Sequence, residues 1–207
     1  MTDLETLLSK LSQLDELRDT DGLREVRQEI VAQHPDSEET AEALYKLGLD
    51  ALFHRRDTAG AIEKFAEASK RKHPFWSQAA RTSLGLCYYQ QRRLPKALLE
   101  LRRVGFREEP TPHSVIALSF LEEILTNQGE GEEATRARRE RVVQLRKLVH
   151  ARENAPASEV AFYLLNLAIA LQDSGLNDEA ATTLQRAEAL GADALDENLL
   201  RTLRRAT

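Results

Sequence analysis

The sequence has few of the residues that interrupt helices. Its 207 residues include nine glycines and six prolines, and aromatic residues make up only 5% of the chain. Hydrophobic residues account for 42% and charged residues for 30%. This balance is typical of a globular, helix-dominated chain and argues against wholesale disorder.

Cysteine is almost absent. The single cysteine, Cys87, has no partner for an internal disulfide, and one cysteine cannot form a cysteine-based zinc site. This scarcity of cysteine fits a reducing compartment. It stands beside Leu86 and Tyr88 with no neighbouring histidine or basic cluster, so we expect a packed, unreactive thiol. The motifs H-E-x-x-H, G-x-x-x-x-G-K-[ST] and G-x-S-x-G are also missing. We therefore expect no enzyme activity, no cofactor and no metal.

The chain lacks an excess of positive charge and lacks long apolar runs. Its net charge is −5 and its pI is about 5.7, so no global positive field attracts nucleic acid or anionic lipid. The first residues, MTDLETLLSKLSQLDELRD, carry acids among leucines rather than a basic segment followed by an apolar one. No stretch approaches the apolar length of a membrane span. These features predict a cytoplasmic location, no membrane span and no general affinity for nucleic acid.

Three histidines near segment boundaries are metal-ligand candidates by residue type: His34, His73 and His113. Their spacing is about one helical hairpin, so they would lie along a ridge instead of converging. Zinc needs its ligands around one point, and we expect structural roles for all three.

What the chain does contain is a recurring set of small and apolar residues. The alanines Ala61, Ala97, Ala134 and Ala180 are separated by 36, 37 and 46 residues. Around them the pattern reads Leu47-Gly48, Ala61, Phe65, Ala68; then Leu84-Gly85, Ala97, Leu101, Val104; then Leu167-Ala168, Ala180, Leu184, Ala187. Small residues let two antiparallel helices approach closely, and larger apolar residues fill the space between them.

This pattern resembles the tetratricopeptide repeat (TPR) family, in which W-x2-L-G-x2-Y is followed by A-x3-F-x2-A and proline in a helix-turn-helix of about 34 residues. The resemblance implies an all-α fold, a right-handed α-solenoid of antiparallel helix pairs. We expect one solenoid over residues 1–207: a helical hairpin at 1–36, repeat units at 37–74, 75–110, 111–155 and 156–190, and a capping helix at 191–207.

The unit at 111–155 departs from the pattern. Either Leu118-Ser119 or Leu121-Glu122 fills the Leu-Gly positions, and Arg138 stands where phenylalanine is expected. The second helix of this unit, about residues 130–153, is predicted to be overlong.

That helix is rich in cations: Arg136, Arg138, Arg139, Arg141, Arg146 and Lys147. They suggest a basic ridge for an acidic protein segment or a nucleic-acid backbone. The interleaved acids Glu132, Glu133 and Glu140 favour the other interpretation, a solvated, salt-bridged helix.

In the TPR family the first helix of each unit lines a concave groove. The resemblance assigns to that wall the following apolar residues: Tyr45, Leu49, Leu52, Leu86, Tyr89, Phe162, Leu165 and Ile169, with Ile116 and Phe120 added in one register of the middle unit. Large exposed apolar patches usually mark interaction sites. The alternative is that the other helices bury much of this set as core, since helical spacing alone does not distinguish the two.

The predicted function is therefore a non-enzymatic protein–protein interaction module, a TPR adaptor or chaperone whose groove binds an apolar peptide or an amphipathic helix of another protein. Some relatives hold a carboxylate with a lysine and asparagine clamp, but Tyr45, Leu49, Ser83 and Leu86 stand at those positions here. Two alternatives stay open: a homodimer or larger building block that pairs through the same wall, and, less favoured, a regulatory nucleic-acid binder that uses helix 130–153.

Overall fold

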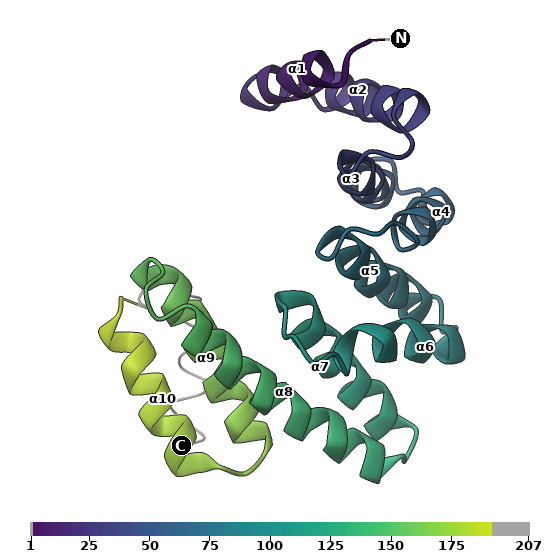
Figure 1. The fold of residues 1–207 in the computed structure, drawn as a ribbon. Helices are drawn as coiled ribbons and strands as arrows, with labels where there is room; N and C mark the ends of the chain where they lie inside the picture. The colour runs from purple at the N-terminus through teal and green to yellow at the C-terminus, as the bar shows by residue number, and fades with distance from the viewer. Residues whose placement is uncertain (1, 192–207) are drawn as a thin grey trace. The chain divides into compact units, whose positions relative to one another are not determined.

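A computed structural model describes residues 2–191, which form ten α-helices and no β-strand (Figure 1). The predicted all-α class of paired helices is confirmed. The helices are α1 (Leu4–Glu16), α2 (Thr20–Gln33), α3 (Glu39–Phe53), α4 (Thr58–Ala68), α5 (Trp76–Gln90), α6 (Leu94–Gly105), α7 (Pro112–Asn127), α8 (Gly131–Ala151), α9 (Ala157–Asp173) and α10 (Asn177–Ala189).

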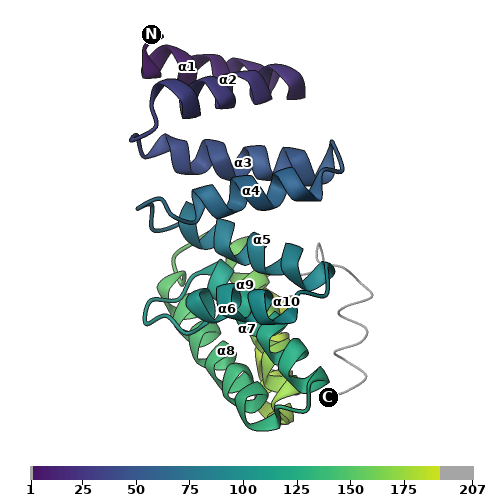
Figure 2. The ribbon, with the colours of Figure 1, turned by 90° about the vertical axis from the view of Figure 1, so that its right-hand side faces the viewer.

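The chain divides into two compact units, Met1–Glu100 and Leu101–Thr207, and each is described by itself. In the first unit α1 packs against α2 and α3 against α4; in the second, α7 packs against α8 and α9 against α10. Figure 2 shows that the helices of the pairs α1–α2 and α3–α4 run antiparallel, as short connecting loops require. The predicted capping helix falls, apart from Gly191, outside the described residues, and the division of one solenoid into the predicted repeat units stays a prediction.

The first helix of each pair ends at a residue in the left-handed backbone region. In the first unit arginines adopt it, Arg18, Arg56 and Arg92, with φ between 54° and 59°, whereas Gly129 and Gly175 adopt it in the second. The loop N–H groups then bond back to the last turn: Arg93 N donates to Tyr88 O and Leu176 N to Leu171 O, both at 2.9 Å. This left-handed turn satisfies helix carbonyls that would otherwise lack donors.

Close packing within the pairs follows the small residues. Gly48 of α3 lies directly against Phe65 of α4, because a Cβ added at Gly48 would meet Phe65 Cε1 at 2.5 Å. Phe65 has no exposed surface. In the last pair Ala168 of α9 and Leu184 of α10 share one buried cluster. These contacts agree with the helix-crossing role predicted for the small residues.

The α7–α8 pair replaces this apolar contact with an ion pair. Arg138 Nε lies 2.6 Å from Glu122 Oε1, so Glu122 holds the place that Gly48 and Ala168 hold in the other pairs. This contact decides between the two registers in favour of Leu121-Glu122. The helix that carries Arg138, α8, has 21 residues and is the longest of the described helices, in agreement with the predicted overlong helix.

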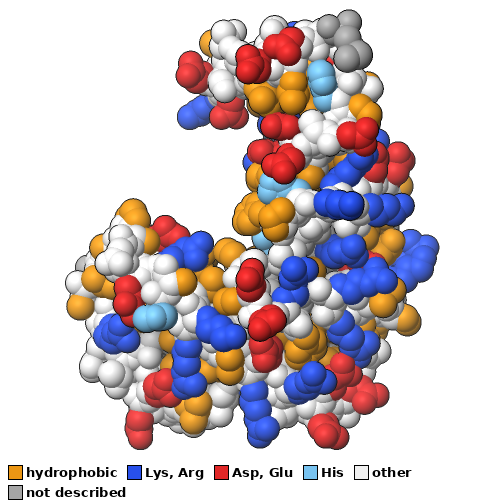
Figure 3. All heavy atoms as spheres, viewed as in Figure 1, with side chains coloured by type: hydrophobic (Ala, Val, Ile, Leu, Met, Phe, Trp, Pro, Cys, Tyr) orange, Lys and Arg blue, Asp and Glu red, His pale blue; other side chains and the backbone are white. Residues whose placement is uncertain are grey.

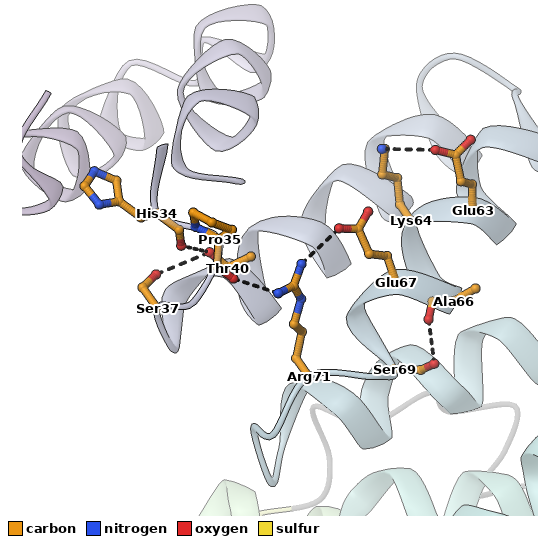
Figure 4. A network of polar contacts seen from close by, with 10 residues as sticks. All are labelled: His34, Pro35, Ser37, Thr40, Glu63, Lys64, Ala66, Glu67, Ser69 and Arg71. Atoms are coloured by element: carbon orange, nitrogen blue, oxygen red, sulfur yellow. Dashed lines mark hydrogen bonds and ion pairs between the residues drawn. The ribbon is translucent and has the colours of Figure 1, made fainter. Parts of the chain in front are cut away.

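Polar contacts join successive loops at one end of the first unit (Figure 4). Arg71, after α4, donates to Pro35 O in the α2–α3 loop at 2.7 Å and pairs with Glu67 at 3.0 Å. Thr40 Oγ1 donates to His34 O at 2.6 Å and fixes the start of α3. Neighbouring helix pairs are thus linked through their loops as well as through their helix faces.

Candidate protein-binding surface

An apolar pocket of about 360 Å³ opens between α3 and α5 of the first unit. Three of the residues predicted for the groove line it together, Leu49, Leu52 and Leu86. The remaining lining residues are Phe53, Arg56, Thr58, Ser83, Cys87 and Gln90. We refer to these nine residues as the apolar pocket.

Helical periodicity explains why these leucines face the pocket. On α3, Ala51 turns toward α4 and is buried, whereas Leu49 and Leu52 are half-buried and pack at the edge of the same cluster. On α5, Leu84 and Cys87 are buried and Leu86 is half-buried. Helices α3 and α5 therefore each show one apolar face to the buried cluster and a second apolar stripe to the pocket. The side chains of that stripe keep exposed surface that a ligand would bury.

Phe53 is a pocket residue that the sequence reasoning missed. It ends α3 and is 61% exposed, which is unusual for a phenylalanine. It directly follows Leu52, the last position that the family pattern assigns to the groove. Extending the apolar stripe by one residue would have found it.

Among the described residues that line the apolar pocket, Arg56 is the only charged one. It is exposed and occupies the left-handed turn after α3, with φ at 57°. Cys87 is buried in the pocket wall, and burial raises the pKa of its thiol, so it stays a neutral apolar group at pH 7. The pocket thus combines leucine and phenylalanine side chains with one cation at its edge.

The two predicted tyrosines of this unit do not line the pocket. Tyr45 is half-buried, with its ring centroid 5.7 Å from that of Phe65 and 5.4 Å from that of Trp76. Lys46 Nζ lies 5.6 Å from the Trp76 ring centroid. Tyr89, near the end of α5, is also half-buried.

The three predicted residues of α9 differ in exposure. Phe162 is 49% exposed and contacts Tyr163 edge-on, with ring centroids 5.5 Å apart. Leu165 is only 3% exposed and packs with Ala168 and Leu184 inside the α9–α10 pair. Ile169 is half-buried against the same cluster. On α9 only Phe162 offers a large exposed side chain.

A polar pocket of about 370 Å³ lies along α7 in the second unit. Its lining residues are Ser119, Glu122, Glu123, Thr126, Asn127, Arg138, Arg141 and Asp173. In the register that Glu122 establishes, Glu123 and Thr126 hold the places of Leu49 and Leu52 on α3. The apolar stripe is therefore not repeated on α7.

The arginines of α8 are used mainly in contacts between helices. Arg141 is 8% exposed and donates to Ser119 Oγ and Asp173 Oδ2, while Arg146 pairs with Glu179 at 2.7 Å. Arg136 lies over the Phe106 ring at 4.8 Å. Figure 3 shows acids and bases interspersed over α7 to α10 on the face in view. These contacts favour a salt-bridged helix over a free basic ridge, although the acidic partners lie on neighbouring helices more than within α8.

Two of the three histidines make local structural contacts. His73 Nδ1 accepts from the N–H groups of Phe75 and Trp76 at the start of α5, both at 3.2 Å, and His34 Nε2 bonds Thr2 O. Burial lowers the pKa of His113. No group of three or more metal-ligating side chains is found within residues 2–191. Nor is any helix of that range long and apolar enough to cross a membrane.

Comparison with known proteins gives matches in structure only. No protein-family model matches the sequence, and no curated protein does. A crystal structure of MamA protein is similar over 93% of this chain and 94% of that one, with 17% identity and a TM-score of 0.52. The nearly identical TPR-like repeats assigned to a kinesin light chain of Podosopora anserina are similar over 94% and 97%, with 16% identity and a TM-score of 0.50. The chain thus has the fold of TPR-like helical repeat proteins, as the resemblance in its sequence implied.

Proposed function

We propose that this protein is a non-enzymatic protein–protein interaction module, an adaptor or chaperone, that binds a segment of another protein at the apolar pocket. One observation carries the proposal: Leu49, Leu52 and Leu86 from two helices, joined by the exposed Phe53, line one open pocket. An apolar peptide or the apolar face of an amphipathic helix fits this surface, because its side chains would cover area that is otherwise in contact with water.

The energy available from the pocket predicts a modest affinity. Burying one leucine or phenylalanine side chain contributes about 2 kcal/mol. Two such anchors contribute about 4 kcal/mol, which corresponds to a dissociation constant of about 1 mM before the peptide is ordered. A useful affinity therefore needs further contacts, for which Tyr45 and Tyr89 of the same unit stay the predicted candidates. Phe162, Leu165 and Ile169 of the second unit stay a separate prediction. Reversible, modest binding suits an adaptor or chaperone.

The proposal is tested by placing a charge in the apolar pocket. Phe53→Asp changes an exposed side chain and should leave the fold intact, and Leu49→Asp acts deeper in the same pocket. Partner proteins are captured on the immobilised full chain and compared with wild type by mass spectrometry. We expect both variants to lose the partners that wild type retains, while circular dichroism keeps the same helicity.

Leu17→Asp is the matched control, because Leu17 is 76% exposed after α1 and does not line the apolar pocket. It should keep every partner. If Phe53→Asp and Leu49→Asp keep the wild-type partner set as well, the apolar pocket is not the binding surface.

Self-association through the same surface is the second candidate, favoured by the same exposed side chains. Light scattering over a dilution series tests it, and a monomer at all concentrations removes it. Nucleic-acid binding by α8 is disfavoured by the ion pairs of Arg138, Arg141 and Arg146, and retention on heparin at low salt is the test. The cytoplasmic location expected from the sequence stays a prediction.

A further inference from the structure

We infer that the segment bound at the apolar pocket is an acidic one, with a carboxylate side chain beside its apolar anchors that pairs with Arg56. This inference rests on the proposed function and adds the chemistry of the partner.

Arg56 has no counter-ion within the described part of the chain. It lines the apolar pocket, and its guanidinium makes no hydrogen bond, ion pair or ring contact with any residue between 2 and 191. The neighbouring Arg55 differs, since its Nε lies 3.2 Å from Asp50 Oδ2. One of two adjacent arginines is thus used within the fold and the other faces the pocket mouth.

The acids nearest in sequence are already engaged. Asp50 is buried and lies between Arg55 and Arg24, the latter at 3.7 Å. Asp57 caps α4 by accepting the Gly60 N–H at 2.8 Å. Because the described lining residues include no carboxylate, an incoming acid meets no fixed negative charge from that part of the pocket wall.

Hydrogen bonds from the loops remove part of the opposing charge at the ends of α3 and α5. Helix C-termini carry a partial negative charge from unpaired carbonyls, but loop N–H groups bond them here: Arg55 N donates to Asp50 O at 3.1 Å and Arg93 N to Tyr88 O at 2.9 Å. A second exposed cation, Arg92, follows α5 two residues after the pocket residue Gln90, and its guanidinium also has no partner among the described residues.

The form of the cation favours a carboxylate. A guanidinium binds a carboxylate through two parallel N–H donors, and a nearby apolar wall reduces the screening of this pair by water. A lysine or arginine in the bound segment would be repelled by Arg56 instead. The leucine-lined wall and the net charge of −5 disfavour a nucleic-acid backbone as the anion, so the occupant is a protein segment.

The test uses two labelled amphipathic peptides with leucines at the same helical spacing. All charged positions are glutamate in the first peptide and lysine in the second. Fluorescence anisotropy with the full chain measures both dissociation constants at low and high salt. We expect the glutamate peptide to bind about tenfold more tightly at low salt and the difference to shrink at high salt.

Arg56→Glu should invert this preference, which a loss of structure would not do. Arg18→Glu is the matched control, because Arg18 holds the same left-handed turn after α1, is exposed and does not line the apolar pocket. It should behave as wild type toward both peptides.

The outcomes separate this inference from the proposed function. If both peptides bind equally to wild type and Phe53→Asp abolishes both, the apolar pocket binds segments without charge selection and the inference fails alone. If neither peptide binds, the inference fails, and the proposed function fails with it only if Phe53→Asp and Leu49→Asp also keep the wild-type partner set. A peptide with the sequence of residues 192–207, in which Asp196 and Glu197 adjoin leucines, is a third probe. Its tighter binding than the glutamate peptide would overturn the assignment to a separate protein.

Discussion

The helix pairs α3–α4 and α7–α8 differ in the side chains that meet where their two helices cross: the contact is apolar in the first pair and charged in the second. In α3–α4 the Phe65 ring lies on Gly48, and in α7–α8 the Arg138 guanidinium lies on the Glu122 carboxylate. The equivalent contact of α9–α10, Ala168 with Leu184, is apolar again. A helix pair of this fold therefore tolerates an ion pair at its crossing point when both positions change together.

The difference extends to the pocket surface of each pair. Beside the Gly48–Phe65 contact, α3 presents Leu49 and Leu52 to the apolar pocket. Beside the Glu122–Arg138 contact, α7 presents Glu123 and Thr126 to the polar pocket. In these two pairs the interior and the pocket wall thus share one polarity. Three predictions test that contrast, and a fourth tests a difference between the turns of the two units.

The largest effect is expected at Phe65. Phe65→Ala removes a fully buried ring from the α3–α4 crossing, and the cavity left behind should lower the free energy of unfolding by about 4 kcal/mol. Urea unfolding followed by circular dichroism measures it. Phe53→Ala, at an exposed phenylalanine of the same pair, should change the stability by less than about 1 kcal/mol. A similar loss for both variants would show that burial does not set the difference.

The second prediction concerns the ion pairs of Arg141 on α8. Arg141→Met should lower the free energy of unfolding by about 3 kcal/mol, because Glu122 and Asp173 lose a nearly buried cation. Arg146→Met, on the same helix, breaks an ion pair with Glu179 that is exposed on both sides and should cost less than about 1 kcal/mol. An equal loss of unfolding free energy at both positions would mean that the ion pairs of Arg141 stabilise the protein no more than an exposed ion pair does.

The two pairs also differ in how far the sequence predicts them. The spacing of Leu47-Gly48, Ala61 and Phe65 matches the family pattern, so their packing followed from the sequence. Arg138 was identified as an exception at the phenylalanine position, but its partner was not, because two registers placed different residues opposite it. Which side chains meet depends on how the two helices are aligned with each other. The sequence pattern gives this alignment only where small residues mark the point at which the helices cross.

The pocket residues show a second limit. Leu49 and Leu165 both satisfy the spacing of a groove residue, yet Leu49 lines the apolar pocket and Leu165 is buried against Ala168 and Leu184. Helical spacing gives the direction of a side chain, whereas exposure depends on what the neighbouring helix places over it. The lack of a partner for Arg56 among residues 2–191 had no sequence signal either, since whether an arginine is paired depends on acids brought near by the fold.

The third prediction converts the charged crossing into an apolar one. Glu122→Ala with Arg138→Leu copies the Ala168–Leu184 contact into α7–α8. Glu122→Ala leaves Arg138 without its partner, and Arg138→Leu leaves Glu122 with Arg141 alone. Both single changes should therefore be destabilising, and the double variant should be more stable than the sum of the two by about 1–2 kcal/mol. Urea unfolding of the four chains gives this coupling. A coupling near zero would show that the two side chains do not stabilise one another.

The smallest effect is expected at the turns, where the first unit uses arginine and the second glycine. A side chain in the left-handed region costs about 1 kcal/mol, and glycine avoids this cost but loses more backbone entropy on folding. Arg92→Gly should therefore raise the free energy of unfolding by about 0.5 kcal/mol, and Gly175→Arg should lower it by about 1 kcal/mol. Nothing lies within 4 Å of a Cβ built at Gly175, so the change in stability should reflect the backbone conformation and not a side-chain clash. If Arg92→Gly instead destabilises the chain, the arginine side chain makes a favourable contribution at the turn, and the turns of the two units are not interchangeable.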